Sequence, residues 1–180
     1  SQIGSAGPEI GMDTPPVADA NRVDALRKMD IIVSCQGGDY TNAMYGRLRA
    51  EGFRGYWIDA ASTLRMNEDA VIVLDPVNRG VIEEAMRKGT KNYIGGNCTV
   101  SLMLMALQGL FQADWVEWLS TMTYQAASGA GAKNMIELVR QMAGLSDACR
   151  SLLTDPSTTA LQLDRAVTGK LRDNTLPTEN

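Results

Sequence analysis

Short apolar runs alternate with amphipathic segments from about residue 20 to residue 96. Four of the runs are rich in β-branched or aromatic residues, as strands buried on both faces of a parallel sheet tend to be. The strand patterns are residues 31–35, 56–59, 71–74 and 93–94, and the helical patterns are residues 24–29, 43–50 and 81–88. This alternation predicts an α/β fold built on a mostly parallel sheet.

The pattern changes after residue 96, and we place a domain boundary there. Residues 97–111 read as a buried helix, residues 115–125 as a strand with partial alternation, and residues 133–142 as an amphipathic helix. Residues 158–171 have a weaker helical period. The opening segment, residues 1–18, is rich in Gly and Pro and predicts a surface connection.

The composition argues against nucleic-acid-binding and membrane proteins. The 180 residues are 44% hydrophobic and 21% charged with a net charge of -4, which is typical of a globular protein. The sequence has no dense patch of Lys and Arg, so we expect no nucleic-acid partner. The most apolar stretch, residues 100–111, is too short for a membrane span, which needs roughly 20 residues, so we expect no membrane association.

The cysteines and histidines restrict the chemistry further. The three cysteines lie far apart with no C-x-x-C pair, which indicates neither a disulfide framework nor a thiolate metal site and fits a reducing, cytoplasmic setting. The chain has no histidine, so it lacks the commonest general base and the commonest metal ligand. We expect no metal.

Cys98 is the candidate nucleophile. It follows Gly95, Gly96 and Asn97 at the start of the predicted apolar helix, where backbone N–H groups and the helix dipole favour an anion. A cysteine at such a position can also be a small packing residue. Asn97 is either the helix cap or a hydrogen-bond donor in a site.

A glycine-rich turn precedes the predicted helix at residues 133–142. Its small residues are Ser128, Gly129, Ala130, Gly131 and Ala132. Such a turn can let backbone N–H groups approach a cofactor phosphate, although many glycine-rich turns are only structural. The turn alone does not decide between the two.

Five segments together resemble bacterial aspartate-semialdehyde dehydrogenases. They are Gly95-Gly96-Asn97-Cys98-Thr99-Val100-Ser101-Leu102-Met103-Leu104-Met105, Cys35-Gln36-Gly37-Gly38-Asp39-Tyr40, residues 56–66, residues 74–78 and residues 123–132. The resemblance runs through nearly the whole chain. It implies NADPH-dependent reductive dephosphorylation of L-aspartyl-4-phosphate to L-aspartate 4-semialdehyde, on the route to lysine, threonine and methionine, by a homodimer.

The resemblance also implies roles for particular residues. Cys98 would carry the acyl group as a thioester, Arg65 would hold the phosphate, and Gln125 would orient the substrate. Without the resemblance, Arg65 reads as a surface arginine and Gln125 equally well as a residue that satisfies backbone groups. The implied NADP-binding residues are Ser1, Gln36, Ser128, Gly129, Ala130, Gly131, Ala132 and Pro156.

The same resemblance sets the expected domains. Residues 1–96 would be part of an NADP-binding domain with a Rossmann-like sheet that lacks its first βα unit, and residues 97–180 the first part of an α+β catalytic and dimerisation domain. Relatives also use a histidine acid/base and further substrate-binding residues that this chain lacks, so we expect an internal segment of the enzyme that is inactive alone. The alternatives are an N-acetyl-glutamyl-phosphate reductase-like enzyme, or a non-catalytic module that has lost its base.

Overall fold

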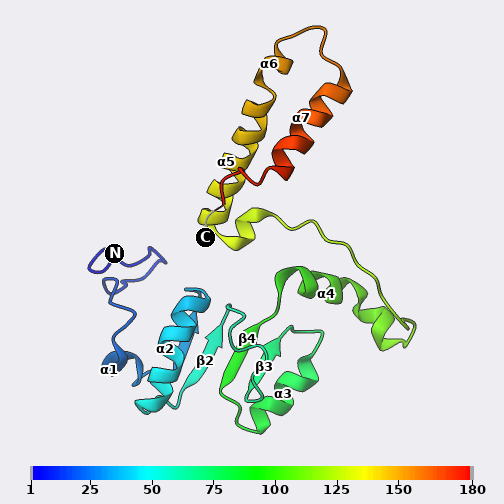
Figure 1. Ribbon diagram of the computed structural model, residues 1–180. Coiled ribbons are helices and arrows are strands. Elements are labelled where there is room, and N and C mark those ends of the chain that lie inside the picture. Colours follow the sequence, from blue (N-terminus) through cyan, green and yellow to red (C-terminus); the bar gives the residue numbers. More distant parts are fainter. Residues whose placement is uncertain (1, 179–180) are drawn as a thin grey trace. The chain divides into compact units, whose positions relative to one another are not determined.

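The computed structural model (Figure 1) describes residues 2–178, which form two compact units that divide between Leu119 and Ser120. The elements of the first unit are α1 (Val23–Leu26), β1 (Ile31–Ser34), α2 (Gly38–Ala50), β2 (Tyr56–Asp59), β3 (Ala70–Val73), α3 (Arg79–Arg87), β4 (Asn92–Gly95) and α4 (Cys98–Gln112). The second unit contains the 3-10 helix η1 (Ala127–Ala130), α5 (Ala132–Ala148), α6 (Arg150–Leu153) and α7 (Ala160–Arg172).

The first unit is built on a four-stranded parallel sheet with the strand order β1-β2-β4-β3. Ile31 is paired with Tyr56, Ile58 with Tyr93, and Val71 also with Tyr93. All four predicted strands are present within a residue or two of the predicted limits. The predicted α/β fold with a parallel sheet is therefore confirmed.

Helix α2 covers one face of this sheet. Its Met44 and Leu48 are fully buried against Trp57 and Ile94, which alternate along their strands with residues of the opposite face. Burying side chains of this size stabilises a fold by about 1.5–3 kcal/mol each. The helix forms there because its buried positions, which include Thr41, recur at intervals of three and four residues.

Helix α3 lies on the opposite face, where its Ile82 and Met86 line an open apolar hollow with Val73 and Tyr93. Burial raises the pKa of the Tyr93 phenol, and the nearby Tyr56 adds to this. At the β1 end of the same face, Ile31 and other apolar side chains are exposed. The sheet therefore has one closely packed face and one that is only partly covered.

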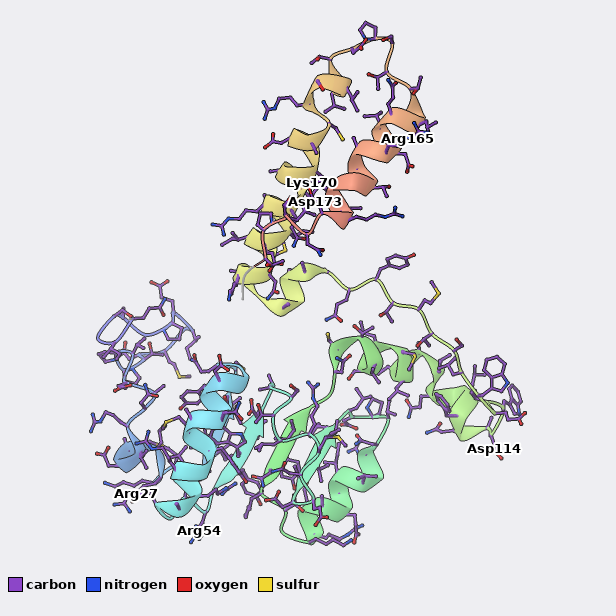
Figure 2. The ribbon with its side chains drawn as sticks, viewed as in Figure 1. Arg27, Arg54, Asp114, Arg165, Lys170 and Asp173 are labelled. Atoms are coloured by element: carbon purple, nitrogen blue, oxygen red, sulfur yellow. The ribbon has the colours of Figure 1, made fainter. Side chains whose placement is uncertain are left out.

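The second unit is a helical hairpin in which α5 and α7 lie side by side (Figure 1). Thr159 begins α7 with a capping box, in which its hydroxyl accepts from the Gln162 backbone N–H and the Gln162 side chain accepts from the Thr159 N–H. Lys170 and Asp173 lie together at the other end of α7 (Figure 2), where their Nζ and Oδ2 atoms are 3.6 Å apart.

The predicted strand at residues 115–125 is wrong. This segment has no regular structure, and Trp115, Trp118 and Tyr124 are exposed. An alternating pattern becomes a strand only beside a pairing partner, and no strand of residues 2–178 pairs with it. The predicted helix at residues 24–29 is also shorter, because α1 ends at Leu26.

The described helices include none that is both long and apolar enough to cross a membrane.

Candidate functional site

Cys98 is the first residue of α4 and is exposed, directly after the turn that leaves β4. Its Sγ lies 4.0 Å from Oγ1 of Thr99. The first-turn N–H groups of a helix have no acceptor within the helix itself and carry its positive partial charge. The sulfur is therefore in the setting that the sequence predicted, at a helix start suited to a developing anion.

Asn97 caps α4. Its Oδ1 accepts from the Val100 N–H at 3.1 Å, and its backbone carbonyl accepts from the Ser101 N–H at 2.8 Å. Of the two roles open from the sequence, the structure shows the cap. The cap fixes where the helix begins, and so it fixes Cys98 at the first helical position.

Gly96 allows the turn to lie tightly against the first turn of α4. A Cβ atom added to Gly96 would lie 2.5 Å from the Ser101 Oγ and 3.6 Å from a methyl carbon of Ile72. A methyl group here would force the Ser101 hydroxyl to rotate away. Close contact with Ser101 therefore explains why a glycine occupies position 96.

Arg65 reaches this same turn from the loop after β2. Its Nε donates to the Gly95 carbonyl at 2.7 Å and its Nη2 donates to the Gly96 carbonyl at 3.1 Å. The guanidinium thus binds the backbone two and three residues before Cys98, and it is not merely a surface arginine. A guanidinium has five N–H donors, so these two bonds leave donors for an anion.

Gln36 lies at the same edge of the sheet, between β1 and α2. The next residue, Gly37, precedes α2 with φ 89° and ψ 174°, a conformation that is essentially restricted to glycine. Tyr40 anchors this turn by donating to the Ala20 carbonyl at 2.6 Å, and burial, together with the Asp19 carboxylate, raises the pKa of Tyr40. Because β2 lies between β1 and β4, the turns that carry Gln36 and Cys98 are separated by the loop that carries Arg65.

The remaining predicted residues belong to the second unit. Gln125 precedes η1, and its Nε2 would lie 3.4 Å from a Cβ added to Gly129, so the Gln125 amide lies against the glycine-rich turn. Ser128, Gly129 and Ala130 form η1, and Gly131, with φ 98° and ψ 174°, leads into Ala132 at the start of α5. Within residues 2–178, no side chain forms a capping hydrogen bond at this helix start.

Pro156 is a predicted cofactor residue that is not brought to this turn. Pro156 follows α6, so the 17-residue length of α5 separates it from the glycine-rich turn, about 25 Å at 1.5 Å per residue. Ser1 lies outside the described residues. The binding roles of both stay predictions.

Asp59 was missed from the sequence as a residue of this site. It ends β2 and is 2% exposed, and its carboxylate accepts from Thr41 Oγ1, Trp57 Nε1 and the Ala61 N–H. An aspartate at the end of an apolar strand was the available signal. Among the described residues, no group of three or more His, Cys, Asp or Glu side chains could hold a metal ion.

Two protein-family models match the chain in consecutive ranges. The semialdehyde dehydrogenase NAD-binding domain matches residues 3–85, and the semialdehyde dehydrogenase dimerisation domain matches residues 107–177. The chain belongs to the semialdehyde dehydrogenase family. This family carries a nicotinamide-dinucleotide-binding domain. The two ranges leave residues 86–106 between them, and a boundary near residue 96 stays a prediction.

Solved structures agree with this family. The aspartate semialdehyde dehydrogenase from Francisella tularensis is 43% identical with a TM-score of 0.78, and the match covers 94% of this chain and 45% of that one. Aspartate semialdehyde dehydrogenase II from Vibrio cholerae, also solved complexed with ASA, is 29% identical with a TM-score of 0.55, covering 67% of this chain and 35% of that one. This chain therefore spans less than half the length of these semialdehyde dehydrogenases.

Proposed function

We propose that this chain carries the nucleophile and part of the cofactor site of an NADP-dependent aspartate-semialdehyde dehydrogenase. The observation that carries the proposal is the β4–α4 turn, where Cys98 begins a capped helix and Arg65 binds the two preceding carbonyls. The 43% identity to the Francisella tularensis enzyme supports the substrate assignment to L-aspartyl-4-phosphate and L-aspartate 4-semialdehyde.

Cys98 would act as a thiolate. Its sulfur attacks the acyl carbon of aspartyl phosphate, the bond from that carbon to the phosphate oxygen breaks, and inorganic phosphate leaves as the thioester forms. The positive end of α4 stabilises the negative charge that develops on the carbonyl oxygen during the attack. Gln125 would hold the substrate beside the thioester.

Arg65 would bind the phosphate that leaves. A guanidinium presents a fixed pair of donors to phosphate oxygens and cannot be deprotonated at ordinary pH. Its two bonds to Gly95 and Gly96 fix its position relative to the turn that carries Cys98. One side chain thus orders the turn and supplies a charge for the phosphate.

The residues present fit a dinucleotide cofactor. Gly37 and Gly131 both have the extended positive-φ conformation, and each leads into a helix that has no side-chain cap. The backbone N–H groups of such a helix start suit phosphate oxygens. NADPH would supply the hydride that reduces the thioester, and we assign Gln36 and residues 128–132 to its binding.

The proposal also covers the source of the acid/base and the oligomeric state. The chain has no histidine, so the acid/base would come from outside these 180 residues, and the chain alone should show no turnover. The match to a dimerisation domain and the exposed apolar side chains of α5, which include Ile136, Val139 and Met142, support a homodimer.

Selective alkylation tests this function. Iodoacetamide should modify Cys98 at least several times faster than Cys35, which is also exposed and so serves as the control within the same chain. Inorganic phosphate should slow the reaction of Cys98, and the Arg65→Ala variant should lose that protection. Peptide mass spectrometry measures both rates. Equal rates at the two cysteines would contradict the nucleophile assignment, and phosphate protection that survives in Arg65→Ala would contradict the phosphate assignment.

A direct assay of NADPH formation tests the expectation that the chain alone shows no turnover. The 180-residue chain is incubated with aspartate semialdehyde, phosphate and NADP, and NADPH formation is followed by absorbance. We expect no signal above the Cys98→Ser variant. Turnover by the unmodified chain would show that the acid/base is present after all.

A further inference from the structure

Asp59 is a buried carboxylate that the proposed chemistry does not use. Its Oδ2 accepts from the Thr41 hydroxyl at 2.6 Å and from the Trp57 indole N–H at 3.1 Å, and its Oδ1 accepts from the Ala61 backbone N–H at 2.9 Å. Burying a carboxylate is costly unless hydrogen bonds compensate for the lost water. An aspartate here therefore calls for a reason beyond packing.

The three donors come from two different segments at the carboxyl edge of the sheet, besides the strand itself. Thr41 belongs to the first turn of α2, and its hydroxyl also lies 3.3 Å from the Gly37 carbonyl. Ala61 belongs to the loop that leads from β2 to Arg65. Asp59 thus joins the first turn of α2, which follows the turn that carries Gln36, to the loop that carries Arg65.

The path from Asp59 to the nucleophile is short. Within the loop, the Arg65 N–H donates to the Ser62 carbonyl at 3.0 Å, so the backbone from residue 62 to residue 65 is a compact turn that directly follows Ala61. The Arg65 side chain then binds the carbonyls of Gly95 and Gly96. The path consists of hydrogen bonds between described groups, joined by stretches of one or two residues of backbone.

We propose that Asp59 is a positioning residue: by accepting from the Ala61 N–H, it fixes the 60–65 loop, and through Arg65 it sets the β4–α4 turn that presents Cys98. Arg65 carries this effect from the loop to the β4–α4 turn. The role of Cys98 as the nucleophile rests on the proposed function. The connection from Asp59 through Arg65 to the β4–α4 turn does not depend on it.

The test variant is Asp59→Asn, which keeps the size of the side chain. A carboxylate accepts at both oxygens, whereas an amide accepts at one end and donates at the other, so asparagine cannot serve both the Ala61 N–H and the Thr41 and Trp57 donors. Hydrogen exchange in the 180-residue chain should become about tenfold faster or more in peptides covering residues 60–66 and 94–101. The ratio of Cys98 to Cys35 alkylation rates should change with it.

Thr41→Val is the matched control, because it removes one donor to the same carboxylate and leaves the Ala61 contact in place. Exchange should become faster at residues 37–42, while residues 94–101 stay within about twofold of the unmodified chain. Thr41→Ser, which keeps the hydroxyl, should restore the α2 turn. In an Arg65→Ala background, Asp59→Asn should change the Cys98 alkylation rate much less than it does with Arg65 present, since the Arg65 bonds to Gly95 and Gly96 have been removed.

Three results would overturn the proposal. They are equal acceleration across all strands in Asp59→Asn, unchanged exchange at residues 94–101, and an effect on Cys98 that is equally large without Arg65. If Asp59→Asn does not fold, native-state exchange of the unmodified chain decides: residues 60–66 and 94–101 should open with one free energy, and separate opening would refute the link. If Cys98 is no more reactive than Cys35, the proposed function fails and the exchange result still stands.

Discussion

Replacing Gly37 by Ala should lower the free energy of unfolding, whereas replacing Gly46 by Ala should raise it. Gly37 precedes α2 with φ 89° and ψ 174°, whereas Gly46 lies inside α2, and a Cβ added to either would meet nothing within 4 Å. Steric contact therefore plays no part in the comparison, and only the backbone conformation differs. Gly37→Ala tests strain, and Gly46→Ala tests helix propensity.

The magnitudes follow from the two conformations. An alanine forced into the conformation of Gly37 costs about 1–3 kcal/mol. An alanine in place of a helix-interior glycine stabilises by about 0.5–1 kcal/mol. The free energy of unfolding of the two variants should thus differ by about 1.5–4 kcal/mol, by summing these estimates.

Trp57 is the reporter for this measurement. It is fully buried in the core of the first unit, whereas Trp115 and Trp118, the other two tryptophans, are each 78% exposed. Replacing Trp115 and Trp118 by Phe leaves Trp57 as the single tryptophan, whose fluorescence follows urea unfolding of the sheet. If Gly37→Ala proves as stable as the starting chain, or if both variants shift the same way, the assigned backbone conformation of Gly37 is refuted.

Three further predictions concern single contacts. Gly96→Ala should lower the urea midpoint by an amount equivalent to about 1 kcal/mol, because the Ser101 hydroxyl must rotate away, and adding Ser101→Ala should restore it; failure to restore would show that the turn itself has moved. Hydrogen bonds from the Ser157 hydroxyl and backbone N–H hold the pKa of Asp155 below its ordinary value, so NMR titration of Ser157→Ala should show a higher pKa. Because the folded pKa is the lower one, this contribution to stability is present above the ordinary pKa and is lost as the pH falls through the folded value. Thr159→Ala should destabilise the α5–α7 hairpin by about 1 kcal/mol in thermal unfolding followed by circular dichroism, and Thr159→Ser should not.

The hydrophobic pattern by itself determined the sheet. The runs around Ile32, Trp57 and Ile94 are short and β-branched or aromatic, and segments with a helical pattern separate them. Strands that alternate with helices in this way bury their side chains in a parallel sheet covered by those helices. Local chemistry likewise placed Cys98 at a helix start, because Gly-Asn before an apolar run is a local signal of a helix beginning. These features depend on neighbours along the chain.

Tertiary structure decided what depends on distant residues. Arg65 binds carbonyls about thirty positions further along the chain, and Asp59 accepts from Thr41 in α2; no local pattern encodes either contact. The opposite failure occurs at residues 115–125, where alternation predicted a strand but the described chain offers no partner to pair with it. Periodicity specifies which face a segment can bury, and only the assembled fold supplies the surface that buries it.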